Sequence, residues 1–168
     1  MCGVVGIIST QKPVAGELYD SLIHLQHRGQ DAAGIMTYNE RFHIKKGTGL
    51  IRDIFDEHNM LRLQGKVGIG HTRYPTVGGF SIEEAQPVLT HVPYGIAMAH
   101  NGNLVNYTEL AQEVAEKDRR HINSSVDIEV ILHIFAHALD HPNSNTDGLS
   151  FFDQICHAVD TVYDRVEG

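Results

Sequence analysis

The sequence has few cysteines, few basic residues and no long apolar run, and each shortage excludes a class of protein. Only two of the 168 residues are cysteine and neither lies in a Cys-x-x-Cys pair, which excludes a disulfide framework. Lysine and arginine number 13 against 21 aspartates and glutamates, and the formal charge of −8 argues against nucleic acid or an anionic membrane as the main partner. No run approaches the roughly 20 apolar residues of a membrane span, and the start lacks the basic flank and cleavage signal of a leader. We therefore expect a soluble, cytoplasmic protein.

The sequence gives little support for two common kinds of ligand site, a phosphate-binding loop and a metal site. No Gly-x-x-x-x-Gly-Lys-Ser/Thr phosphate loop occurs. A metal site has one candidate, a stripe of residues four apart formed by Glu129, His133, His137 and His141. The stripe lacks the His-Glu-x-x-His arrangement, and Pro142 predicts that the helix ends just before it. We favour a solvated stripe, expect no metal, and keep a metal-binding module on His133 and His137 as an alternative that elemental analysis would detect.

What is present is an ordinary globular balance, with 42% hydrophobic and 20% charged residues in one domain's length. Valine and isoleucine crowd between two glycines in the segment 3–8, which predicts a buried strand. Further strands are predicted over 33–38, 42–46, 66–70, 88–92 and 95–100. Helical spacing predicts helices over 14–26, 54–63, 107–118, 126–139 and 149–165. Antiparallel-looking strand pairs with helices grouped between them predict an α+β fold.

The sequence also predicts helix caps, a hairpin and a long loop. Asn106 is the predicted cap of the helix 107–118, and Ser124 or Ser125 that of the helix 126–139. The segment 33–38 should form a hairpin with 42–46. The segment 72–87, with two prolines and adjacent glycines, has the composition of a long loop, and such loops are usually functional or mobile.

The two cysteines differ in their surroundings. Cys156 lies in an apolar stretch, where a free cysteine is most often a small buried hydrophobe. Cys2 follows Met1, so removal of Met1 would give it a thiol and a free α-amine on one residue. An α-amine titrates at about 7.7–8.0 and can accept a proton near neutral pH, which is the arrangement of an N-terminal nucleophile. Alternatively, its position beside the start of the chain is an accident.

Four blocks of small and polar residues accompany Cys2. They are Leu25 to Gly34, Gly70 to Thr76, His100 to Leu104 and Ser124 to Glu129. Taken singly, each has a structural explanation as a turn, a helix end or a helix start. Taken together and in order, with the start Met-Cys-Gly-Val-Val-Gly-Ile, they resemble the glutaminase domain of class II glutamine amidotransferases, and specifically the amidophosphoribosyltransferase branch of purine synthesis. The resemblance spans nearly the whole chain.

The resemblance implies a role for each matching residue. Cys2 would be the nucleophile, with Arg28 beside it. The Asn101 side chain and the Gly102 N–H would form the oxyanion hole. The remaining matches would bind L-glutamine: Arg73 its α-carboxylate, Asp127 its α-ammonium with help from Thr76, and Tyr74 as the aromatic residue of a glutamine loop over 73–84. Val77 departs from the polar residue of some relatives.

For the whole chain, the resemblance implies an N-terminal nucleophile hydrolase fold. This fold has four layers, αββα, with two antiparallel sheets. Residues 1–168 would be a glutaminase domain incomplete at its C-terminal end, since they stop short of strands that the family's domain normally adds. The phosphoribosyltransferase domain would be absent. Glutamine would be hydrolysed to glutamate and ammonia, and the ammonia would pass to phosphoribosyl pyrophosphate in the full enzyme. No cofactor is expected in this chain, Mg²⁺ would accompany phosphoribosyl pyrophosphate in the missing domain, and the full-length enzyme would be a homo-oligomer.

Two alternatives to this function remain. The chain could be a non-catalytic glutamine-binding or regulatory domain that keeps Arg73 and Asp127 but does not use Cys2. It could also be the glutaminase domain of another class II amidotransferase.

Overall fold

The computed structural model describes residues 1–74, 81–141 and 150–168, which form a mixed α+β fold. The chain divides into two compact units, Met1–Val88 with Ala97–Asn101 and Leu89–Ile96 with Gly102–Gly168. None of the helices in the described ranges combines the length and the apolar character needed to cross a membrane.

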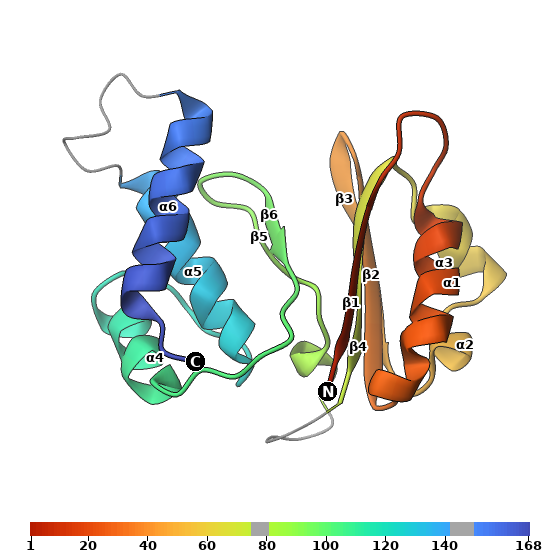
Figure 1. Cartoon of the computed structure of the whole chain (residues 1–168), viewed down its shortest axis with the longest axis horizontal. Coiled ribbons are helices and arrows are strands. Elements are labelled where there is room, and N and C mark those ends of the chain that lie inside the picture. The colour runs from red at the N-terminus through yellow and green to blue at the C-terminus, as the bar shows by residue number, and fades with distance from the viewer. Residues whose placement is uncertain (75–80, 142–149) are drawn as a thin grey trace. The chain divides into compact units, whose positions relative to one another are not determined.

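The first unit is built on a four-stranded antiparallel sheet (Figure 1). Its strands are β1 (Gly3–Ile8), β2 (Ala32–Asn39), β3 (Arg41–Thr48) and β4 (Val67–Arg73), in the order β1-β4-β2-β3. The predicted hairpin is confirmed as β2 and β3, which turn at Glu40 with a φ of 60°. In the register, Gly3 of β1 lies opposite Thr72 of β4, and Ala32 of β2 lies opposite Arg73. The start of the chain is therefore held at the C-terminal end of β4.

Three helices cover one face of this sheet (Figure 1). They are α1 (Ala15–Leu25), α2 (Ile51–Ile54) and α3 (Glu57–Arg62). Leu18 and Leu22, one helical turn apart on α1, are fully buried in a core that includes Ile35 of β2. Burial of an aliphatic side chain stabilises the fold by about 1.5–3 kcal/mol, so this stripe fixes α1 on the sheet.

The second unit is mainly helical. Its helices are α4 (Tyr107–Glu116), α5 (Asp127–Asp140) and α6 (Phe151–Arg165), and α5 packs against both of the others. Its core joins Leu110 and Val114 of α4 to Val130 and Ile134 of α5. The short strands β5 (Val88–Thr90) and β6 (Ile96–Met98) pair in a separate two-stranded sheet where the chain passes between the units.

Several predicted boundaries are wrong, because side chains bond to distant or unexpected partners. The helix predicted over 54–63 is observed as α3, which begins only at Glu57 because the chain is extended at Phe55 and the Asp56 side chain caps the helix by accepting a hydrogen bond from the Asn59 N–H at 2.7 Å. The preceding helix α2 was not predicted. Asn106 makes no cap bond; its side chain donates to the Arg165 carbonyl oxygen at 2.8 Å and accepts from the Glu167 N–H at 3.1 Å.

Further corrections concern a loop, a second cap and a cysteine. β4 continues to Arg73, so the start of the predicted loop 72–87 is strand. Neither Ser124 nor Ser125 occupies the N-cap position of α5; Val126 does, and no side chain makes a cap bond there. Cys156, expected to be buried, is exposed. The prediction that the histidine-bearing helix ends before Pro142 is confirmed, since α5 ends at Asp140.

Candidate active site

Cys2 is fixed by its backbone at the end of the four-stranded sheet. The Arg28 Nε donates a hydrogen bond to the Cys2 carbonyl oxygen at 2.9 Å, and the Gly3 N–H donates to the Thr72 hydroxyl at 3.1 Å. The Cys2 thiol is half-buried, and its sulfur lies 3.8 Å from the Tyr74 carbonyl oxygen. Three residues predicted from separate blocks, Cys2, Arg28 and Tyr74, are thus brought together.

Arg28 reaches Cys2 because the segment after α1 turns back against β4. A short 3₁₀ turn over Gln26–Arg28 follows α1. The next residue, Gly29, packs so closely on β4 that a side-chain Cβ there would lie 2.6 Å from the Arg73 carbonyl carbon. Only glycine permits this approach. The Asp31 N–H then donates to the Arg73 carbonyl oxygen at 3.2 Å, which joins this segment to the strand that carries Arg73.

The Arg73 guanidinium already holds a carboxylate in this structure. Its NH2 group lies 2.5 Å from the Glu84 Oε2, and its NH1 group donates to the Glu84 carbonyl oxygen at 3.2 Å. Both side chains are largely buried, with 12% and 9% of their surfaces exposed. A planar guanidinium with paired donors suits carboxylate recognition, so the arrangement is chemically consistent with the role predicted for Arg73. Glu84 was assigned no role from the sequence, where it is the end of the predicted glutamine loop.

Asn101 follows His100, whose backbone N–H and carbonyl oxygen are each held by a buried side chain. The His71 Nε2 lies 3.2 Å from the His100 carbonyl oxygen, and the Gln86 Oε1 accepts a hydrogen bond from the His100 N–H at 2.7 Å. Burial lowers the pKa of His71 from 6.5 to about 4, so its ring is uncharged near neutral pH. Sequence reasoning gave neither residue a role, although both lie close to predicted residues or motifs.

The other predicted residues are distributed as follows. Tyr74 is 54% exposed. Thr76 and Val77 lie outside the described residues. Gly102 and Asp127 belong to the second unit, where Asp127 begins α5 and its Oδ2 accepts a hydrogen bond from the Leu104 N–H at 3.1 Å. The binding and catalytic roles of all these residues stay predictions.

The stripe predicted to be solvated is solvated only at its C-terminal end, where His141 is exposed; Glu129 and His133 are largely buried and His137 is half-buried. Glu129 is buried, and its carboxylate accepts hydrogen bonds from the backbone N–H groups of Asn123 and Ser124. The His137 Nε2 lies 3.6 Å from the Asp118 Oδ1, and burial lowers the pKa of both His133 and His137. Within the described ranges, no three His, Cys, Asp or Glu side chains form a group that could hold a metal ion.

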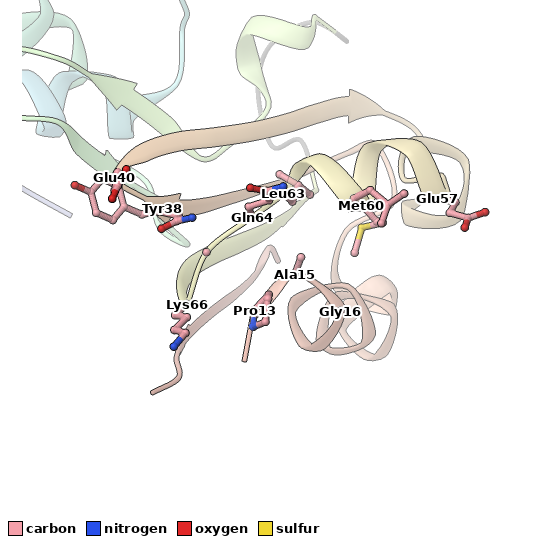
Figure 2. A pocket seen from close by; sticks show the side chains of 13 residues that line it. Pro13, Ala15, Gly16, Tyr38, Glu40, Glu57, Met60, Leu63, Gln64 and Lys66 are labelled. Carbon is pink, nitrogen blue, oxygen red and sulfur yellow. The ribbon is translucent and has the colours of Figure 1, made fainter. Parts of the chain in front are cut away.

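A cavity of about 780 Å³ in the first unit lies away from these residues (Figure 2). Pro13, Tyr38, Met60 and Lys66 are among the residues that line it. Tyr38 lies opposite Val67 at the start of β4, whereas Cys2 adjoins the other end of that strand. The cavity is therefore distinct from the group formed by Cys2, Arg28 and Tyr74.

The family of this chain follows from its similarity to known proteins. Residues 53–154 match the family model described as a glutamine amidotransferase domain. The chain belongs to that family. The class II resemblance noted in the sequence is thereby confirmed, and the chain matches the N-terminal third of amidophosphoribosyltransferases.

Individual relatives agree with this family assignment. The amidophosphoribosyltransferase of Haemophilus influenzae is 47% identical over 171 residues, which is 100% of this chain and 33% of the relative. That of Escherichia coli is 54% identical over 142 residues, 83% of this chain and 28% of the relative. The solved structure of glutamine phosphoribosylpyrophosphate amidotransferase from B. subtilis, complexed with ADP and GMP, matches with a TM-score of 0.77 and 32% identity, over 100% of this chain and 33% of that one. This amidotransferase-family chain thus spans about a third of the length of these relatives.

Proposed function

We propose that this chain hydrolyses L-glutamine to glutamate and ammonia through a thioester on Cys2. The Cys2 sulfur attacks the side-chain amide carbon, and the thiol proton passes to the α-amine that removal of Met1 exposes. That proton then leaves with the amide nitrogen as ammonia. Water hydrolyses the γ-glutamyl thioester, which releases glutamate and restores the thiol.

One observation carries this proposal: a half-buried cysteine at position 2 is held beside the strand that ends in Arg73, in a chain of the glutamine amidotransferase domain family. The Arg28 contact fixes the Cys2 carbonyl, which limits how far the thiol can move. Holding a nucleophile in one place removes part of the entropic barrier to its attack.

The remaining site residues receive complementary roles in the proposal. Arg73 binds the α-carboxylate of glutamine with paired donors, and Asp127 binds its α-ammonium with help from Thr76. Tyr74 lies in the loop that covers the substrate. Asn101 and the Gly102 N–H donate to the oxygen of the tetrahedral intermediate as it gains charge, which is the interaction that accelerates the chemical step.

The relatives suggest a wider reaction for a longer protein that contains this domain. Its ammonia would pass to phosphoribosyl pyrophosphate, with Mg²⁺, in a phosphoribosyltransferase domain, within a homo-oligomer. In fold, we propose the four-layer αββα arrangement of N-terminal nucleophile hydrolases. The four-stranded antiparallel sheet with helices on one face would supply two of the layers.

The decisive experiment compares the two cysteines. Cys2→Ala should abolish glutamate release from glutamine, whereas Cys156→Ala should leave it intact, because Cys156 is exposed on α6 and Cys2 is held at the end of the sheet. Intact mass of the wild-type chain should show loss of Met1. A diazo-ketone analogue of glutamine should add to Cys2 alone in peptide mapping.

Glutamine binding without glutamate release, measured by titration calorimetry beside the activity assay, would instead identify a non-catalytic glutamine-binding domain. Equal losses of activity from the two cysteine replacements would exclude the nucleophile assignment.

A further inference from the structure

The backbone of His100, the residue that precedes Asn101, is held at both of its polar groups. The His100 N–H donates to the Gln86 Oε1 at 2.7 Å, and the His100 carbonyl oxygen lies 3.2 Å from the His71 Nε2. The two side chains come from different parts of the first unit, since His71 is on β4 and Gln86 precedes β5. Because the N–H and the carbonyl oxygen of His100 are both engaged, the backbone that leads into Asn101 is fixed in position and direction.

His71 is built to donate a hydrogen bond rather than to exchange protons. It is 0% exposed and lies in the middle of the sheet, opposite Val4 of β1 and Gly34 of β2. Burial keeps its ring uncharged, and an uncharged imidazole carries one N–H. Because the Nε2 faces a carbonyl oxygen, that nitrogen is the donor. The Nδ1 has no hydrogen-bond partner in the described part of the chain.

Both the side chain and the backbone of Gln86 are held in place by the first unit. Its side chain is buried, and its backbone packs so tightly on β2 that a Cβ at Gly34 would lie 2.2 Å from the Gln86 carbonyl oxygen. The preceding residue, Ala85, accepts a hydrogen bond from the Lys46 Nζ of β3 at 2.6 Å. Two strands of the sheet therefore hold the segment that presents Gln86 to His100.

We propose that His71 and Gln86 are positioning residues for Asn101. By holding the His100 carbonyl oxygen and the His100 N–H, they aim the Asn101 side chain at the oxygen of the tetrahedral intermediate. This inference rests on the proposed glutaminase function. An oxyanion donor acts in the transition state more than in the bound substrate, so loosening it should lower kcat and leave KM nearly unchanged.

The first test separates the hydrogen bond from the packing of His71. His71→Met removes the donor and should lower kcat for glutamine roughly 10- to 100-fold, less than the roughly 100- to 1000-fold expected for loss of the donor itself in Asn101→Ala. His71→Gln places an amide N–H near the Nε2 position and should restore most of that loss. Gln86→Met removes the acceptor and should repeat the effect of His71→Met. Gln86→Glu keeps an oxygen acceptor and should therefore lower kcat less than Gln86→Met.

The second test asks whether the effect passes through Asn101. In the Asn101→Ala background, His71→Met should lower kcat by less than roughly threefold, because the donor it positions is already gone. A merely structural role would lower kcat equally in both backgrounds. Amide hydrogen exchange gives a readout independent of activity: the His100 N–H should exchange faster in Gln86→Met, while the Ile69 N–H within β4 should not change.

The outcomes distinguish this inference from the proposed function. A wild-type chain that does not hydrolyse glutamine overturns the proposed function, and the positioning role falls with it even if the exchange data show the clamp. A wild-type chain that hydrolyses glutamine, with kcat unchanged in both His71→Met and Gln86→Met, overturns the positioning role alone. Equal losses with and without Asn101 overturn it as well.

Discussion

Arg73 has a carboxylate partner before any substrate arrives. Glu84 engages its NH2 group through the carboxylate and its NH1 group through the backbone, in surroundings that exclude most water. Hydrogen bonds between ionised groups are roughly twice as strong as neutral ones. A guanidinium has five N–H donors, so Glu84 can orient the group while other donors stay available for a substrate carboxylate.

At the residue scale, we predict that Arg73→Lys raises KM for glutamine roughly 10- to 100-fold and changes kcat little. Lysine keeps the charge but offers no planar pair of donors, and losing one charge-assisted hydrogen bond costs about 1.5–3 kcal/mol. Steady-state glutamate release measures both constants. Arg41→Lys, at the start of β3, is the matched control and should leave both unchanged. A fall in kcat with an unchanged KM would contradict the carboxylate-binding role.

At the element scale, α6 begins with a capping box whose loss can be measured. The Ser150 hydroxyl accepts a hydrogen bond from the Asp153 N–H, and the Asp153 carboxylate accepts one from the Ser150 N–H, both at 3.2 Å. Ser150→Ala should lower the free energy of unfolding by about 1 kcal/mol in urea titrations followed by circular dichroism. Ser150→Thr keeps a capping hydroxyl and should lose less. If Ser150→Ala were as stable as the wild type, the capping box would contribute nothing to stability.

Elements that depend on local pattern were predictable, and those that depend on distant pairing were not. β1 and the β2–β3 hairpin follow from their runs of apolar residues and the turn between them. The strand β4 is predicted to end at residue 70, because its last residues become strand only through pairing: Thr72 with both β1 and β2, and Arg73 with β2. Asn106 has the composition of a cap, but its side chain bonds to the chain after α6 instead.

The same division applies to the candidate site. Cys2, Arg28 and Tyr74 were identified by resemblance, and the register of β1 on β4 explains why they meet. Glu84, His71 and Gln86 carry no local signal of their contacts. Their partners lie 11, 29 and 14 residues away along the chain, so only the folded sheet brings them together.

At the scale of the whole molecule, both units contain histidines whose pKa is lowered by burial. His71 lies in the sheet of the first unit, and His133 and His137 lie on α5 of the second. Burial lowers the pKa of all three. Protonating such a group in the folded state places a charge where water solvates it less well than in the unfolded chain, so acid should favour unfolding.

We predict that the chain loses stability as the pH falls below the ordinary histidine value of 6.5, and that His71 accounts for a large share of the loss. Between 6.5 and about 4 the unfolded chain binds a proton at His71 that the folded chain does not. The contribution of His71 to the free energy of unfolding therefore falls as the pH drops across this window and is constant below it. Because one pKa unit corresponds to about 1.4 kcal/mol, the share of His71 should be about 2–3 kcal/mol between about pH 7 and about pH 4.5. Urea titrations at these two pH values should show that loss in the wild type and a correspondingly smaller one in His71→Gln, which cannot titrate and keeps the donor to His100.

The pH dependence of the free energy of unfolding that persists in His71→Gln should come from His133, His137 and the carboxylates. An identical loss in the two proteins would mean that His71 is protonated in the folded chain as readily as in the unfolded one.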